Sequence, residues 1–126
     1  MAGSASLQNY RQSPRKVRLV ADFIRGKEAA RALSILSALP KRAALPVEKL
    51  LRSAIANAKG PASGEGFIVA KIEVNQGTVI KRFMPRARGS AAPIRKKSSH
   101  VTLTLGPSKA SKAPAKKKEA KEVTTA

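Results

Sequence analysis

Residues 78–103 read TVIKRFMPRARGSAAPIRKKSSHVTL, and this stretch decides the fold. It carries seven Lys or Arg residues, two prolines and one glycine, and it has no Asp or Glu. A stretch with that composition is too basic to be buried in a hydrophobic core. The segments on either side have the pattern of strands, so the stretch is predicted to be a basic insert within a β-hairpin.

The two flanking segments alternate apolar and polar residues with the period of a half-buried strand. In residues 67–77, FIVAKIEVNQG, the residues predicted to point inward are Ile68, Ala70, Ile72 and Val74. In residues 99–105, SHVTLTL, the inward residues are Val101, Leu103 and Leu105, with His100, Thr102 and Thr104 outward. Residues 6–11, SLQNYR, are a candidate third strand.

The insert is long enough to form an arm that projects from the domain. Residues 78–83 and 92–97 can continue the two strands outward, and nine or ten extended residues reach roughly 30 Å at about 3.3 Å per residue. Pro85, Pro93 and Gly89 are expected to prevent a regular ladder throughout and to favour an irregular tip around residues 85–91. A hairpin arm is therefore predicted over about residues 76–101.

Three helices are predicted between the first and second strands. The first follows Ser13, a capping residue, and Pro14, which suits the first helical position, and Gly26 ends it. Its buried face is predicted to hold Val17, Val20, Ala21 and Ile24. The second, within residues 27–39, buries Ala29, Ala32, Leu33 and Leu36 and stops at Pro40. The third is predicted to start at Pro46 and to bury Val47, Leu50, Leu51, Ala54, Ile55 and Ala58.

These elements predict an α+β fold, in which three helices pack on a small antiparallel sheet and a long hairpin arm protrudes. Residues 1–105 are predicted to form one domain with an aliphatic core, because the 126-residue chain has only four aromatic residues. Residues 106–126, GPSKASKAPAKKKEAKEVTTA, have almost nothing to bury and are predicted to be a disordered basic tail.

The charge of the chain indicates its partner. The net charge is +19, from 26 basic and 7 acidic residues, and nucleic-acid phosphate is the common cellular species that neutralises such a protein. An anionic membrane would instead require a basic amphipathic helix, which is not where the charge is densest. The chain has no cysteine and no apolar run long enough to cross a bilayer, so an intracellular setting is expected. No homo-oligomer is expected.

The catalytic alternatives find little support in the sequence. His100 is the only histidine, and no acid lies near it in the sequence to orient it. Ser98 and Ser99 are adjacent to His100, but adjacency does not make a nucleophile and base pair. The Gly-Lys pair at residues 26–27 lacks the glycine loop of a P-loop. We therefore expect no enzyme activity, metal site or cofactor.

Two basic clusters are candidates for contact with nucleic acid. One lies in the arm, where the arginines can stack on bases and bind phosphate with two hydrogen bonds. The other lies at the start of the first helix, where helix N–H groups favour anions. It comprises Arg11, Ser13, Arg15, Lys16 and Arg18. Ordinary solvated surface charge is the alternative, and it is weak for the arm because no acid occurs between Val74 and Lys118.

The chain resembles the family of the twenty-second protein of the bacterial large ribosomal subunit. The resemblance covers about residues 7–105 and is carried by SPRKVRLVADFIRGK, AARALSIL, KLLRSAIANA and VNQGTVIKRFMPRARGSAAPIRKKSSHVTLTL. It implies a domain on the outer surface of the subunit near the peptide exit, with an arm that threads through 23S rRNA. The arm's tip would line the nascent-peptide tunnel, opposite a loop of a neighbouring protein and close to the macrolide site.

The resemblance also implies functional residues. The residues of the tip and the tunnel side would be Lys81, Arg82, Met84, Pro85, Arg86, Ala87, Arg88, Gly89 and Ser90. The residues of the returning strand along rRNA would be Arg95, Lys96, Lys97, Ser98 and His100. The cluster at the first helix would be the body contact. Ser90 and Ala92 stand where the family pattern leads us to expect a basic and a polar residue, so the contact there would be lighter.

The sequence thus predicts a non-catalytic, cytoplasmic protein of the large ribosomal subunit. It would bind 23S rRNA, support subunit assembly and contact neighbouring proteins and the nascent polypeptide. A DNA-binding architectural protein is the alternative, because such proteins also carry basic β-arms, some with a proline at the tip. An RNA chaperone or RNA-processing enzyme is a second alternative, disfavoured by the absence of an acid and base pair.

Overall fold

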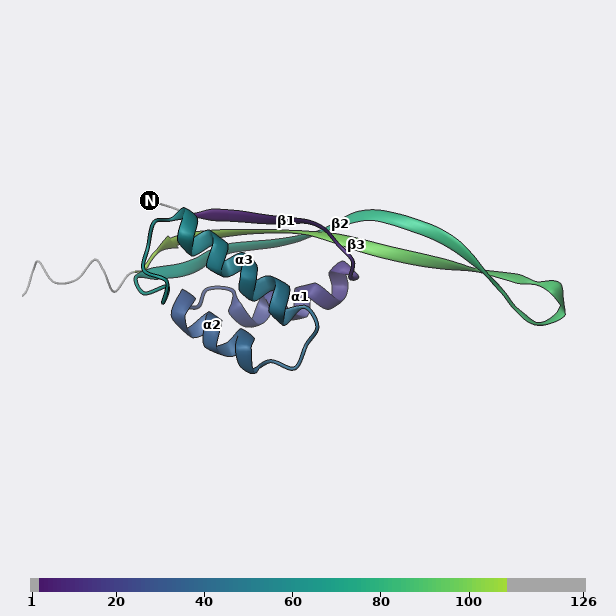
Figure 1. Ribbon diagram of the computed structural model, residues 1–126, viewed down its shortest axis with the longest axis horizontal. Coiled ribbons are helices and arrows are strands. Elements are labelled where there is room, and N and C mark those ends of the chain that lie inside the picture. The colour runs from purple at the N-terminus through teal and green to yellow at the C-terminus, as the bar shows by residue number, and fades with distance from the viewer. Residues whose placement is uncertain (1–2, 109–126) are drawn as a thin grey trace, which may run out of the picture.

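The computed structural model describes residues 3–108, and three helices cover one face of a three-stranded sheet in it (Figure 1). The elements in chain order are β1 Ser4–Tyr10, α1 Pro14–Ile24, α2 Ala29–Ala38, α3 Ala44–Asn57, β2 Phe67–Pro85, a 3₁₀ turn Ala87–Gly89 and β3 Ala91–Pro107. The strands are antiparallel in the order β1-β3-β2. The predicted α+β class and the candidate third strand are confirmed. The predicted tail lies outside the described residues, apart from its first three. Of these, Gly106 and Pro107 pair with β2 as the last residues of β3, so the predicted start of the tail is two residues too early.

Local sequence explains how α1 begins and ends. Pro14 occupies the first turn, where a missing N–H costs no helical hydrogen bond, and Ser13 is the N-cap residue although its side chain makes no capping bond. Gly26 has φ of +73° and donates its N–H to the carbonyl of Val69 at 3.0 Å, so the left-handed glycine turns the chain and ties it to β2. The predicted buried face of α1 is confirmed.

The third helix begins earlier than the sequence suggested. α3 starts at Ala44, two residues before Pro46, because Ala43 and Ala44 bury their side chains in the core. Pro46 is tolerated there because the first N–H groups of a helix have no partner within the helix. The predicted buried face of α3 is confirmed, and Leu51 and Ile55 are among its fully buried members.

The first half of β2 differs from its predicted alternation. Val69 pairs with Leu105 and Lys71 with Thr104, so Ala70 is an extra residue in a β-bulge. The bulge adds one residue to the strand, so the side chains before it point to the faces opposite to those that a regular alternation predicts. As a result Val69 is fully buried and Ala70 is exposed, the reverse of the prediction, whereas Ile72 and Val74 beyond the bulge point inward as expected.

The core lies between the sheet and the helices and is aliphatic. The inward residues of β3, which were predicted from the sequence, are almost completely buried and sit in the central strand: Val101, Leu103 and Leu105. They pack with the buried faces of the three helices in a single cluster. Because the central strand belongs to this core and also continues into the arm, the core fixes where the arm leaves the domain.

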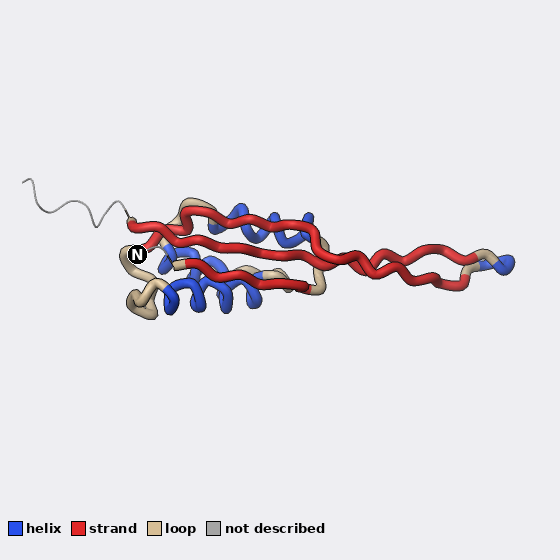
Figure 2. The backbone as a smooth tube through the Cα atoms, turned by 90° about the horizontal axis from the view of Figure 1, so that it is seen from above, coloured by secondary structure: helices blue, strands red, loops and turns tan. Residues whose placement is uncertain are grey.

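The arm is a two-stranded extension of β2 and β3, and Figure 2 shows it projecting well beyond the helices. Its ladder is regular from the pair Val79 and Lys97 to the pair Pro85 and Ala91. The expectation that the prolines would interrupt the ladder is therefore wrong. The N–H of Arg86 donates to the carbonyl of Ser90 at 2.8 Å, and counting back from that bonded pair places both prolines at non-bonded positions. Their nitrogens face outward, so no ladder bond is lost.

The arm joins the domain at a tightly packed irregularity. The register shifts between Gln76 and Val79, and the hydroxyl of Ser98 donates to the carbonyl of Thr78 at 2.6 Å. A Cβ added to Gly77 would lie 2.6 Å from Ser98 Oγ. Glycine at residue 77 therefore lets the two strands approach closely where the arm begins.

Candidate nucleic-acid interface

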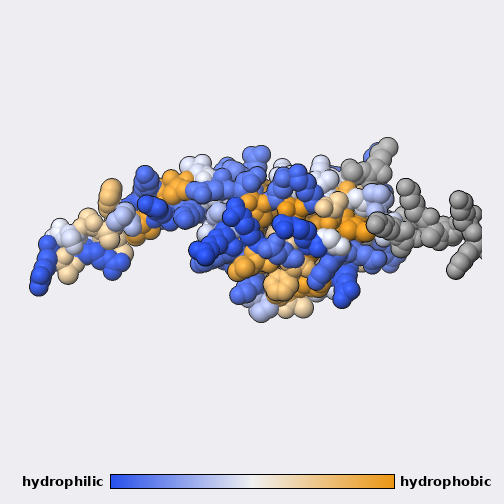
Figure 3. Space-filling view, turned by 180° about the vertical axis from the view of Figure 1, so that it is seen from behind, coloured by the Kyte–Doolittle hydropathy of each residue, from blue (hydrophilic) through white to orange (hydrophobic). Residues whose placement is uncertain are grey.

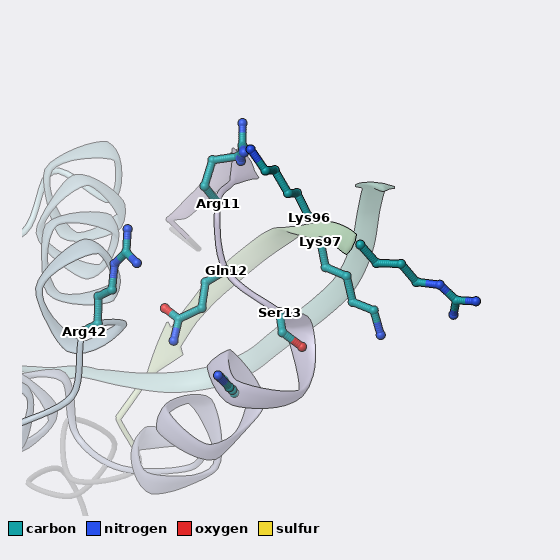
Figure 4. Close-up of a pocket in the computed structure, with 8 residues that line it drawn as sticks. Arg11, Gln12, Ser13, Arg42, Lys96 and Lys97 are labelled. Atoms are coloured by element: carbon teal, nitrogen blue, oxygen red, sulfur yellow. The ribbon is translucent and has the colours of Figure 1, made fainter. Parts of the chain in front are cut away.

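A basic depression of about 680 Å³ lies where the arm leaves the domain. Its lining contains six cations and no acid, and consists of Arg11, Gln12, Ser13, Lys16, Arg42, Arg95, Lys96 and Lys97. Figure 4 shows these side chains arising from separate segments around one hollow. Six uncompensated cations around one concave surface favour a polyanion strongly.

Four elements supply the lining of the basic depression. The loop between β1 and α1 contributes Arg11, Gln12 and Ser13, and the first turn of α1 contributes Lys16. The loop between α2 and α3 contributes Arg42, and the returning strand β3 contributes residues 95–97. Members of the two basic clusters that the sequence showed separately, at the first helix and in the arm, therefore share one surface.

Tyr10 holds two of these segments in place. Its hydroxyl donates to Gln12 Oε1 at 2.8 Å and lies 3.4 Å from the carbonyl oxygen of Arg42. Gln12 and Arg42 were not predicted as site residues. No local signal marks them, because their place in the depression depends on how the loops before α1 and α3 meet in the folded domain.

The N-terminal end of α1 adds its dipole to the depression. The N–H groups of Lys16 and Val17 donate to the carbonyl of Ser13, which closes the first turn of α1. The N–H groups that precede them in a helix have no acceptor within the helix and can bind a ligand. Together with the partial positive charge of the helix start, this end favours phosphate. That this segment contacts an anion remains a prediction.

Two arginines stabilise the contact between α1 and β2: Arg18 within α1 and Arg25, the residue that follows its last turn. Arg18 was predicted as a contact residue, and its Nε and Nη2 donate to the carbonyl of Val74 at 3.2 and 3.1 Å. Arg25 likewise donates to the carbonyl of Ile72 at 3.3 Å. Both arginines bind α1 to β2. Arg15 and Arg18 do not line the basic depression.

Ser98 and His100, two further predicted contact residues, are used within the arm's base. Ser98 is only 4% exposed and its hydroxyl donates to the carbonyl of Thr78. His100 Nδ1 accepts the N–H of Asn9 at 3.1 Å, where Asn9 has φ of +54° in the irregular part of β1. The hydroxyl of Ser98 is thus used within the protein, and Nε2 is the ring nitrogen of His100 that is left for contact with another molecule.

The arm itself presents cations and apolar side chains on both faces. Cross-strand partners share a face, so Lys81 and Arg95 lie together on one and Arg82 and Ile94 on the other. Every residue from 81 to 91 is exposed, and Phe83 is 76% exposed. Figure 3 shows hydrophilic and hydrophobic side chains intermixed along the arm, with hydrophilic ones at its end. The remaining tip residues predicted from the sequence are all exposed there: Met84, Pro85, Arg86, Ala87, Arg88, Gly89 and Ser90.

The described residues offer little for other kinds of site. Between residues 3 and 108 there is no group of three or more His, Asp or Glu side chains that could hold a metal ion. In the same range, no helix is both long enough and apolar enough to cross a membrane.

Comparison with known proteins gives a consistent result. The sequence model of a family described as "Ribosomal protein L22p/L17e" matches residues 5–106. The chain is 50% identical to the "Large ribosomal subunit protein uL22" of Pelobacter propionicus over 111 residues, which cover 86% of this chain and all of that protein. Proteins of the same name from Myxococcus xanthus and Herpetosiphon aurantiacus are 47% and 49% identical, over 86% and 83% of this chain and 99% and 95% of theirs.

Proposed function

The chain belongs to the ribosomal protein L22p/L17e family, and we propose that it is a structural protein of the large ribosomal subunit that binds 23S rRNA. It takes part in translation in the cytoplasm as part of this ribonucleoprotein and has no catalytic role of its own. Membership of this family favours the ribosomal interpretation over the DNA-architectural alternative.

The convergence of six cations in the basic depression is the observation that carries the rRNA proposal. Arginine and lysine side chains from the body and from the base of the arm surround one hollow without an acid. Such a surface gains phosphate contacts and releases counterions when it binds RNA. We infer that one RNA segment lies in the depression and touches body and arm together, so that binding also fixes the direction of the arm.

The presence of cations and apolar side chains on both faces of the arm supports threading through RNA. An arm lying on a surface needs cations on one face only, whereas this arm carries cations and exposed apolar residues on both. Each face can therefore meet phosphates and stack on bases or sugars. Residue 73 is the last acid before residue 119, so no acid within the arm repels the RNA.

The tip of the arm is proposed to reach the wall of the nascent-peptide tunnel. There the segment from Met84 to Ser90 would face the growing polypeptide and a neighbouring protein. Ser90 donates its hydroxyl to the carbonyl of Ala87 at 2.9 Å and so closes the turn. Its role is internal to the tip, which agrees with a lighter contact to RNA at this residue.

The proposed rRNA-binding residues fall into two groups. The body and base of the arm contribute Arg11, Ser13, Arg15, Lys16, Arg42, Lys97 and His100, with Arg18 and Ser98 in supporting roles through their bonds to β2. The arm contributes Lys81, Arg82, Arg86, Arg88, Arg95 and Lys96. Within the first group, Lys16 and Arg42 are expected to act through their charge, and Ser98 only through the bond that shapes the arm's base.

Binding to purified nucleic acids tests the proposal. The full chain is titrated against transcribed 23S rRNA and against duplex DNA of equal length, and then sedimented with large subunits in high salt. We expect tighter binding to the rRNA and retention on the subunit as salt is raised. Release from the subunit at moderate salt, together with equal or tighter binding to duplex DNA, would contradict the proposal.

A further inference from the structure

The outer edge of β1 has unbonded backbone groups at Ser6 within the described part of the chain. β1 is the edge strand of the sheet, and the N–H of Leu105 donates to the carbonyl of Gly3 at 2.8 Å. Counting from that bonded pair, Ala5 and Leu7 bond toward β3, so the backbone groups of Ser4 and Ser6 point away from the sheet. Asn57 Nδ2 donates to the carbonyl of Ser4 at 2.8 Å. Among the described residues, no hydrogen bond meets the outward N–H or C=O of Ser6.

Two hollows lie beside this edge, each lined by residues of both β1 and α3. The first is mainly apolar, has a volume of about 400 Å³ and is lined by Leu7, Leu45, Pro46, Lys49 and Leu50. The second is mainly polar, has a volume of about 480 Å³ and is lined by Ser4, Ala5, Ser6, Ser53, Asn57 and Thr102. Figure 2 shows the short edge strand with a helix running alongside it. We call these two hollows together the edge groove.

The lining of the edge groove differs in chemistry from the basic depression. Leu45 is 60% exposed in the mainly apolar hollow, and Lys49 is the one cation among the residues that line either hollow. No acid lines it. An apolar hollow beside unpaired main-chain donors and acceptors suits an extended polypeptide, because a strand can repeat those bonds whereas RNA has no matching alternation.

We propose that the edge groove binds an extended segment of another protein of the large subunit, which adds to β1 as a fourth strand. This inference rests on the proposed function, because it presumes assembly into that subunit. The segment would bond to the N–H and C=O of Ser6 and place one apolar side chain against Leu7 and Leu45. A carboxylate near that side chain would face Lys49. The groove thus provides a protein-binding surface separate from the rRNA-binding surface at the arm.

Site-specific crosslinking in assembled subunits tests this inference. A photoreactive benzophenone amino acid replaces Lys49 in the full chain, subunits are purified, and the crosslinked products are mapped by mass spectrometry. We expect crosslinks to one contiguous segment of one ribosomal protein. Ser6→Pro removes the outward N–H without removing a bond to β3, so it should lower the yield of that crosslink at least tenfold.

Two further variants keep the result decisive. Ser6→Ala keeps the outward N–H and is the matched control, whose crosslink yield should equal that of the parent chain. Leu45→Glu puts an acid in the apolar hollow at a residue that is already exposed, so the fold is retained and the crosslink should again fall at least tenfold.

Other outcomes would overturn the proposal. Crosslinks from position 49 mainly to rRNA would show that RNA occupies the groove, and subunits that contain the chain but give no protein crosslink would show that nothing docks there. An undiminished crosslink in Ser6→Pro would exclude strand addition. Failure of the parent chain to enter subunits would refute the proposed function itself, and this inference with it.

Discussion

Replacing Arg42 and Lys96 by glutamine together should weaken rRNA binding in a manner that depends on salt. Both side chains line the basic depression, one from the loop before α3 and one from the arm, and both are exposed. Each phosphate contact contributes about 0.7 to 0.9 to the slope of log K against log salt concentration, so losing two should reduce the slope by about 1.4 to 1.8. That reduction weakens binding about 25- to 60-fold at about 0.1 M salt and leaves binding near 1 M salt unchanged.

The assay is a salt titration of binding to 23S rRNA. Affinities of the parent chain and of the double variant are measured at several salt concentrations, and the two slopes are compared. The control is a second double variant, Arg31→Gln with Lys59→Gln, which removes the same charge from exposed residues outside the depression. If both double variants lowered the slope equally, the effect would be one of net charge and the depression would not be the site. An unchanged slope in Arg42→Gln with Lys96→Gln would refute the reasoning directly.

Three further outcomes are expected. Gly77→Ala should lower the free energy of unfolding by about 1–3 kcal/mol, because the added Cβ meets Ser98 Oγ; urea unfolding that matches the parent would contradict the close contact. Leu51→Ala should lower it by about 2–5 kcal/mol, since the side chain is fully buried, and a smaller loss would mean that the core relaxes there. Amides of residues 81–97 should exchange rapidly in the free protein, because an isolated two-stranded ladder is marginal in water, and slowly on 23S rRNA. Strong protection in the free protein would count against threading.

Much of the fold could be predicted because its signals are local. The apolar spacing of α1 and α3 identified their buried faces, and the alternation in residues 101–105 identified the central strand. The arm was predictable because its basic composition excludes burial. Family resemblance in the same stretch added the expected partner, and the family match over residues 5–106 confirms the resemblance itself.

The remaining features depend on pairing between distant residues. Ala70 is exposed because of a bulge that appears only in the register with β3. Pro85 and Pro93 fit the ladder because the turn at the tip places both of them at non-hydrogen-bonded pairs. Composition does not show which residues fall at such pairs. Arg42 joins the depression through tertiary contact alone, and Ser98 is buried because Gly77 allows the strands to approach.

Crosslinking of the arm's tip to a nascent polypeptide tests the central claim most directly. The chain has no cysteine, so Ala87→Cys places one unique thiol at the tip and Arg31→Cys places one on α2 as the control. Each variant is assembled into ribosomes that hold a stalled nascent chain, and a thiol-reactive crosslinker is added. The account predicts a nascent-chain adduct from position 87 and none from position 31. The absence of an adduct from position 87 in assembled ribosomes, whether or not position 31 gives one, would contradict it.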